Sequence, residues 1–183
     1  MTGSALLAEL LPDVWTWWRI ADPGWSNPLD PGFARERGGR WNGPASFDTL
    51  YLNEDRVTAR MNLRAFIADW PYEPEDLRAD NGPVLIGARL PRSQQVCDAH
   101  TPEGLAAAGL PKSYPLDTRG RPVSHQRCQP IGQQAKEAGL RGVRARSAQS
   151  PAGAGRELAW FPATRRSVAR QTKRLLFDDW YWS

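Results

Sequence analysis

The segment ERGGRWNGPASFDTLYLNED, residues 36–55, decides how this sequence is read. Gly38 and Gly39 come directly before Arg40 and Trp41, and a third glycine follows two residues later. A buried strand or helix gains nothing from clustered glycines, because each one adds backbone freedom that folding must remove. A disordered linker has little use for a tryptophan. The combination predicts a sharp, ordered turn that presents Arg40 and leads into a strand.

Regular elements are expected on both sides of this turn. Residues 14–20 (VWTWWRI) and 49–52 (TLYL) are aromatic, aliphatic and β-branched, which is typical of strands. Over residues 53–70 the apolar positions recur at about 3.6-residue spacing, which predicts a helix capped by Asn53 and ended by Pro71. The other expected elements are a helix at 4–11, a long ordered loop at 21–46, strands at 83–90, 142–148 and 156–161, a short helix around 131–138, and a helix or a strand in the tail. Residues 91–135 are ambiguous, with turns expected at 110–122.

The composition predicts one α+β domain spanning all 183 residues. The chain has 16 glycines and 16 prolines, which favours short elements and many turns over a helix bundle. No apolar run approaches the roughly 20 residues that a membrane span needs, and no secretory signal is visible. Two cysteines do not form a disulfide framework. We therefore expect a cytoplasmic protein.

The charge is distributed unevenly along the chain. Residues 1–90 carry 9 basic and 13 acidic side chains, a net charge of −4, whereas residues 91–183 carry 15 and 7, a net charge of +8. The basic half fits an anionic ligand, a nucleic acid or an acidic partner protein. The arginines and aromatic residues of the tail also fit nucleic-acid binding, although a charged outer face is the better default.

The glycine turn is a candidate phosphate site. Backbone N–H groups in such a turn can bind phosphate oxygens, and Arg40 would add a bidentate, charge-assisted pair. Arg19, at the end of the first strand, would provide a second guanidinium for a pyrophosphate. Spacing alone favours the simpler alternative, in which Arg40 is solvated and Trp41 fills the core. The sequence contains neither the GxGxxG motif nor a Walker motif, so neither of the common nucleotide-binding folds is indicated.

Two further polar residues are candidates for ligand contacts. Tyr51 lies on a strand and its ring could stack on a flat base, although a half-buried strand tyrosine is the commoner case. Asn62 lies in the middle of an amphipathic helix, where asparagine has poor helix propensity. A polar residue on a buried helix face needs a partner, such as a ligand hydroxyl, although it could also face solvent or bond a neighbouring strand.

The cysteines and histidines form a paired pattern. Cys97 and His100 are separated by two residues, as are His125 and Cys128, and these are the only cysteines and histidines of the chain. A Cys₂His₂ zinc site has this residue count and local spacing. No β-hairpin knuckle is evident around either pair, so we expect no metal and keep zinc as the alternative.

The motifs taken together resemble the RES-domain family, the toxin half of bacterial RES–Xre toxin–antitoxin pairs. That resemblance spans about residues 15–162 and leaves 163–183 as a basic and aromatic C-terminal extension. It implies an α+β, ADP-ribosyltransferase-like fold with a mixed β core and flanking helices. The motifs are WRI (18–20), GGRWN (38–42), LYL (50–52), TARMN (58–62), VRARSA (143–148) and ELAWF (157–161).

The family is named for an arginine, a glutamate and a serine. The resemblance places Arg19 and Ser147 at the first and third of these positions, and Asn62 at the position that commonly holds glutamate. Asparagine can hydrogen-bond a ribose hydroxyl but cannot supply the negative charge that stabilises a developing cation. Glu54, at the start of the helix, is a possible substitute.

The resemblance implies NAD⁺ as a substrate, with no other cofactor. It implies catalytic roles for Arg19, Tyr51, Asn62 and Ser147, and substrate contacts from Arg19, Arg40, Trp41, Asn42 and Tyr51. The expected function is a toxin that depletes NAD⁺ as a glycohydrolase or phosphorylase. The alternatives are ADP-ribosylation of a protein, a weakened binding protein, or a nucleic-acid-binding protein. The expected partner is an Xre-like helix-turn-helix antitoxin. The toxin would contact nucleic acid only indirectly, through this antitoxin.

Overall fold

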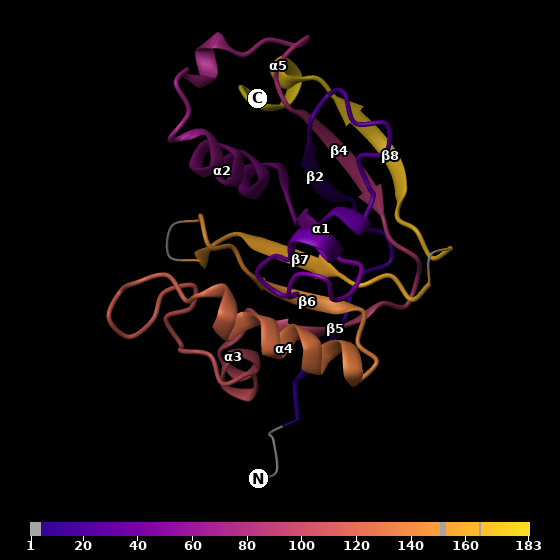
Figure 1. Ribbon diagram of the computed structural model, residues 1–183, viewed down its shortest axis with the longest axis vertical. Coiled ribbons are helices and arrows are strands. Elements are labelled where there is room, and N and C mark those ends of the chain that lie inside the picture. Colours follow the sequence, from indigo (N-terminus) through magenta and orange to yellow (C-terminus); the bar gives the residue numbers. More distant parts are fainter. Residues whose placement is uncertain (1–4, 151–152, 165) are drawn as a thin grey trace.

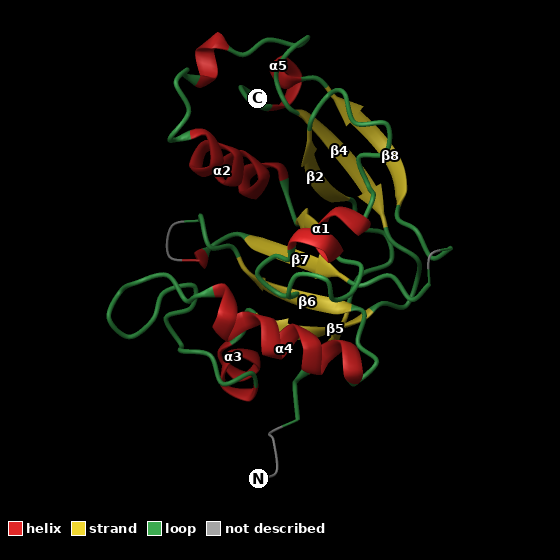
Figure 2. Ribbon diagram, in the orientation of Figure 1, coloured by secondary structure: helices red, strands yellow, loops and turns green. Residues whose placement is uncertain are grey.

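An eight-stranded mixed sheet forms the centre of the part of the chain that the computed structural model describes, residues 5–150, 153–164 and 166–183 (Figures 1 and 2). The strand order is β1-β5-β6-β7-β3-β2-β4-β8, and every neighbouring pair is antiparallel except the parallel pair β5 and β6. The prediction of an α+β fold is therefore confirmed. The strands are β1 (Ala8–Leu10), β2 (Trp17–Ala21), β3 (Leu50–Asn53), β4 (Val84–Arg89), β5 (Gln95–Ala99), β6 (Gly142–Arg146), β7 (Arg156–Trp160) and β8 (Arg170–Leu175).

The helices cover the sheet in two groups. Helices α3 and α4 pack on the half built from β5 and β6, whereas α2 and α5 pack on the half built from β2 and β4 (Figure 1). Each group has its own buried cluster of hydrophobic side chains, and a third cluster lies along the strands. Strands β7 and β3 connect the two halves, so side chains on these strands lie between the helix groups. The α-helices are α1 (Gly32–Arg37), α2 (Arg56–Ile67), α3 (Pro102–Ala107), α4 (His125–Glu137) and α5 (Phe177–Trp180), and a 3₁₀ turn covers Pro74–Asp76.

Helix α2 forms as its apolar spacing predicts, with a different N-cap. Asp55 accepts a hydrogen bond from the Thr58 N–H at 2.7 Å and caps the helix. Asn53 is instead the last residue of β3, and its amide donates to the Trp18 carbonyl at 3.1 Å. Leu63 and Ile67 bury the inner face of the helix against the sheet.

Three local predictions are wrong. The expected helix at 4–11 contains strand β1 instead, which pairs with β5. The expected loop at 21–46 contains helix α1. Helix α4 begins six residues before the expected start at 131, and it carries Pro130 in its interior, a residue that usually argues against a helix.

The C-terminal tail is part of the domain rather than an extension from it. Strand β8 pairs with β4 at the edge of the sheet, and α5 follows. Phe177, Trp180 and Tyr181 pack with residues of α2 in one buried cluster. Within the described residues, no helix combines the length and apolar character needed to cross a bilayer.

Candidate active site

Tyr51 locks the glycine turn onto strand β3. Its hydroxyl donates to Asn42 Oδ1 at 2.7 Å and accepts the Trp41 N–H at 2.9 Å. Asn42 is fully buried and its Nδ2 donates to the Ala34 carbonyl of α1 at 2.7 Å. Burial raises the pKa of the Tyr51 phenol far above its ordinary value, so the hydroxyl stays protonated and keeps its donor role.

Three glycines in and next to this turn are required by close contacts or by backbone conformation. A Cβ on Gly39 would lie 2.4 Å from the Tyr51 hydroxyl oxygen, and Gly38 adopts a positive φ of 75°. Helix α4 approaches the turn equally closely, because a Cβ on Gly132 would lie 1.7 Å from the Trp41 carbonyl oxygen. The turn is therefore fixed between a strand side chain and a helix backbone.

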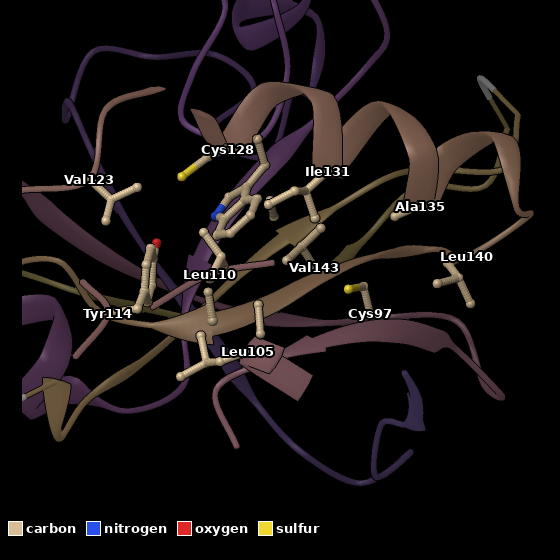
Figure 3. Packing of buried hydrophobic residues seen from close by; sticks show 14 of the residues in the cluster. Cys97, Leu105, Leu110, Tyr114, Val123, Cys128, Ile131, Ala135, Leu140 and Val143 are labelled. Atoms are coloured by element: carbon tan, nitrogen blue, oxygen red, sulfur yellow. The ribbon is translucent and has the colours of Figure 1, made fainter. Parts of the chain in front are cut away.

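The side chains of the turn point into the fold. Arg40 donates to the Val123 carbonyl at 2.8 Å, just before α4. Trp41 is only 2% exposed and belongs to the cluster beneath α3 and α4, part of which is shown in Figure 3. Because Trp41 and Asn42 are enclosed by protein, we correct the expectation that they contact substrate and assign them to holding the turn.

Arg19 has a different environment from Arg40. It lines a cavity of about 230 Å³ together with Trp25, Asp30 and Phe33, and Arg40 does not line that cavity. Within the described residues the Arg19 guanidinium has no hydrogen bond or ion pair, and it lies 5.8 Å from the centre of the Trp25 ring. The expected clamp of two guanidinium groups is thus not assembled, because Arg40 is engaged by a carbonyl in the other half of the molecule.

Burial without a partner lowers the pKa of Arg19 to about 10, and the nearby carboxylate of Asp30 opposes this shift. The side chain is therefore a cation at neutral pH. A half-buried, unpaired guanidinium of this kind is suited to an anionic ligand.

Asn62 lines a second cavity of about 550 Å³, which adjoins the first because Trp25 lines both. The walls of this cavity are mainly apolar and aromatic, including Phe66 and Trp70 of the α2 region and Ile20 of β2. Apolar walls with few polar groups are typical of sites for organic ligands. Arg19 and Asn62 thus belong to two neighbouring parts of one hollow region.

The side chain of Asn62 belongs to a hydrogen-bonded group that includes the fully buried Ser147. Glu157 Oε1 accepts from Asn62 Nδ2 at 2.8 Å and from Ser147 Oγ at 2.6 Å, and Asn62 Nδ2 also donates to Asn53 Oδ1 at 2.6 Å. Ser147 Oγ lies 3.2 Å from Asn62 Oδ1. The structure therefore brings together the predicted residues Asn62 and Ser147.

Glu157 is the residue of this group that sequence reasoning missed. It lies on β7, where Leu158 and Trp160 belong to the buried cluster along the strands. A glutamate at the start of a largely apolar strand was the available signal, because a charged side chain there needs a specific partner.

Glu54 is not the substitute carboxylate that the sequence suggested. Its Oε2 accepts from Arg144 Nε at 2.9 Å and from Nη2 at 2.7 Å. Arg144 also pairs with Glu9 at 2.9 Å, and Glu9 contacts His100 Nε2 at 2.9 Å. This ion-pair group uses the charge of Glu54 internally.

The four cysteines and histidines do not converge on a metal site. His100 contacts Glu9, whereas His125 begins α4. Cys97 and Cys128 are both buried, and Figure 3 shows Cys128 toward the Val123 end of the cluster and Cys97 toward the Leu140 end. Burial raises the pKa of Cys97 to about 12, which keeps it a thiol. Within the described residues, Glu9, Asp98 and His100 are the one group with metal-like spacing, and Arg144 already neutralises part of it.

Comparison with known families decides the affiliation of the chain. The model of the RES domain matches residues 16–179. The chain belongs to the RES domain family. This match reaches past the expected boundary at 162 and includes β8 and most of α5. No curated protein matches the chain.

A solved structure supports the same fold. This RES domain is similar to a chain of the M. tuberculosis MbcT–MbcA toxin–antitoxin complex, with a TM-score of 0.70 and 19% identity over 92% of this chain and 90% of that chain. At this identity the likeness establishes a shared fold, in keeping with the α+β class expected from the sequence.

Proposed function

We propose that this RES domain is the NAD⁺-cleaving toxin of a toxin–antitoxin pair. The observation that carries the proposal is the hollow region beside β2 and α2, with the unpaired Arg19 in one part and Asn62, linked to Ser147, in the adjoining part. A dinucleotide offers a matching arrangement of groups, namely an anionic centre, riboses rich in hydroxyls and two flat rings.

Arg19 would bind the diphosphate. Its guanidinium has no partner among the described residues, so a phosphate oxygen gains a charge-assisted hydrogen bond without first breaking an ion pair. Asp30 lies nearby and limits how much negative charge the site can hold. With one guanidinium and one carboxylate nearby, the site suits a diphosphate ester, which carries two negative charges, better than a more highly charged ligand.

The aromatic residues of the hollow region would hold the flat rings. Trp25, Phe66 and Trp70 line the larger cavity, and their faces offer stacking surfaces to a base or to nicotinamide. Tyr51 lines neither cavity, because its hydroxyl is engaged by the glycine turn and its ring packs against Gly39 and the cluster beneath α3 and α4, so we assign it to holding the turn rather than to stacking.

The chemistry would require little acid–base catalysis. The bond between ribose C1′ and nicotinamide N1 breaks, and the bonding electron pair leaves with the nitrogen, which was cationic and becomes neutral nicotinamide. The sugar becomes oxocarbenium-like and is captured by water, with release of a proton, or by phosphate. Asn62, which lines the larger cavity, would hold a ribose hydroxyl during this step, and the fully buried Ser147 would orient the side chains around it.

The partner would be an antitoxin that covers the hollow region. The similar solved structure is a toxin–antitoxin complex, and exposed apolar side chains surround the cavities here. Phe33 is 52% exposed, Phe66 69% and Trp25 42%. Large apolar side chains on a rim fit a protein that excludes NAD⁺ by occupying its site. We propose an Xre-like helix-turn-helix protein in this role, with both proteins acting in the cytosol.

Nicotinamide release tests this proposal directly. Purified protein is incubated with NAD⁺, with and without phosphate, and the products are separated by chromatography. We expect release by the wild type and by the control Arg170→Ala, which alters an exposed arginine of β8, and none by Arg19→Ala. Absence of release from folded wild-type protein under both conditions would overturn the proposal. The product, ADP-ribose or its 1″-phosphate, identifies the acceptor.

A second test uses cells. Inducing the protein without its antitoxin should lower cellular NAD⁺ and stop growth, whereas inducing Arg19→Ala to the same level should do neither. Normal NAD⁺ in cells that accumulate the wild-type protein would count against the toxin assignment.

A further inference from the structure

We infer that Glu157 is the catalytic carboxylate of this site, although it lies on a strand 95 residues away from Asn62. The inference rests on the proposed function and adds a residue to it. Its basis is the hydrogen-bonded group of Asn62, Ser147 and Glu157, in which Glu157 is the single ionisable side chain.

The geometry leaves one carboxylate oxygen available. Oε1 of Glu157 accepts both short hydrogen bonds, from Asn62 Nδ2 at 2.8 Å and from Ser147 Oγ at 2.6 Å. Within the described part of the chain, no hydrogen bond or ion pair involves Oε2. One oxygen therefore fixes the orientation of the side chain, and the other can accept a hydrogen bond from a ribose hydroxyl held beside Asn62.

The reaction needs a negative charge at this place. Breaking the bond from C1′ to a nitrogen leaves positive charge on the sugar, and a preoriented carboxylate stabilises such a transition state. Asn62 and Ser147 are neutral and cannot do this. Glu54 and Glu9 are carboxylates, but Arg144 pairs with both of them. Glu157 is the carboxylate that hydrogen-bonds Asn62, the proposed ribose-binding residue, and Ser147.

The amide of Asn62 is the complement of this carboxylate. A glutamate at position 62 would place two carboxyl groups within hydrogen-bonding distance, and repulsion would force one of them to keep a proton. An amide there instead donates to Glu157. The pair consequently holds one negative charge, which the sequence places on β7 rather than on α2.

During the step, Glu157 exchanges no atoms with the substrate. The C1′–N1 bond breaks with its electron pair going to nicotinamide, while the Glu157 charge faces the sugar as it becomes cationic. A water oxygen then bonds to C1′ and its proton is released to solvent. Removing the carboxylate should therefore lower kcat while leaving the binding of NAD⁺ nearly unchanged.

The test compares four proteins by steady-state release of nicotinamide and by thermal unfolding. They are the wild type, Glu157→Gln, the double variant Asn62→Glu with Glu157→Gln, and the control Glu103→Gln on the exposed face of α3. We expect Glu157→Gln to lose kcat by about 10²–10³-fold with KM within about threefold, as for other single electrostatic groups. The control should match the wild type. The double variant again has one carboxylate and one amide, with the carboxylate now at position 62 and the amide at position 157. We expect its kcat to be at least tenfold higher than that of Glu157→Gln.

The outcomes separate this inference from the proposed function. If the wild type cleaves NAD⁺ and folded Glu157→Gln cleaves it equally fast, the inference is overturned and the proposed function stands. If the folded wild type releases no nicotinamide, both are overturned. Should Glu157→Gln fail to fold, Glu157→Asp decides, because it keeps the charge but withdraws it from the sugar. A loss of at least tenfold in kcat supports the inference, and wild-type turnover overturns it.

Discussion

Gly39 and Tyr51 are in direct contact, and the Tyr51 ring occupies the space in which a side chain at position 39 would begin. The hydroxyl oxygen, Cζ and Cε2 of Tyr51 lie 2.4, 2.6 and 2.7 Å from the position of a Cβ on Gly39. The same ring connects strand β3 to the cluster beneath α3 and α4. The turn that first identified the family thus acts as a structural junction between the two halves of the fold.

Replacing Gly39 by alanine should destabilise the fold. The new methyl group would overlap the Tyr51 ring, so either the ring or the turn must move, and we expect a loss of about 3 kcal/mol in the free energy of unfolding. Denaturant titration measures this loss. Gly43→Ala is the matched control, because no atom lies within 4 Å of a Cβ at Gly43, and its midpoint should be close to the wild-type value. Equal midpoints for both variants would contradict the proposed contact.

Tyr51→Phe separates the structural role of the hydroxyl from the role of the ring. Removing the oxygen leaves the Trp41 N–H and Asn42 Oδ1 without a partner, which should cost about 1–3 kcal/mol of stability. The ring remains, so kcat for NAD⁺ cleavage should stay within a few-fold of the wild type. A large loss of kcat in a stable protein would show instead that the hydroxyl takes part in the reaction.

The affinity for NAD⁺ should depend on the charge of Arg19. Burial lowers its pKa to about 10, and the protonated form is the one that binds a diphosphate. Affinity should therefore be constant between pH 6 and 8 and fall as the pH rises through about 10. Calorimetric titration measures this, with circular dichroism at each pH to confirm that the protein is folded. Arg19→Lys should bind more weakly at neutral pH, because a lysine cannot form the bidentate pair.

Arg144 should matter more for stability than an exposed arginine. Its side chain is 11% exposed and pairs with both Glu9 and Glu54, so Arg144→Met leaves Glu54 unpaired and leaves Glu9 with His100 alone. We expect a loss of about 2–3 kcal/mol, less than for a fully buried pair. Arg121→Met is the control, since that side chain is 67% exposed and pairs with Asp117 alone, and it should cost less than about 0.5 kcal/mol. Similar losses in the two variants would contradict this difference.

The sequence was sufficient for features that depend on local spacing. The period of residues 53–70 predicted α2, and short β-branched or aromatic runs predicted strands at β2, β3, β4, β6 and β7. It failed where tertiary contacts outweigh local preference. Pro130 concealed the start of α4, and the segment around β1 reads as a helix but is held as a strand by pairing with β5.

The candidate site shows the same division. The motifs predicted Arg19, Asn62 and Ser147. They could not predict Glu157, which links Asn62 to Ser147. Glu157 meets Asn62 only because β7 pairs with β3, in a register that places Glu157 opposite Asn53, which itself accepts a hydrogen bond from Asn62. Trp41 and Asn42 were assigned to the ligand because the family resemblance implied it. Helix α4 covers this turn, an arrangement that the close approach of Gly132 reveals only in three dimensions.

The packing of α5 against α2 has a genetic consequence. Phe177, Trp180 and Tyr181 support the inner face of the helix that carries Asn62, although they lie more than a hundred residues after it. A premature stop codon after Leu176 would spare every proposed site residue and still remove this support. Bacteria that survive the loss of the antitoxin should therefore yield late nonsense and frameshift alleles as readily as lesions at Arg19.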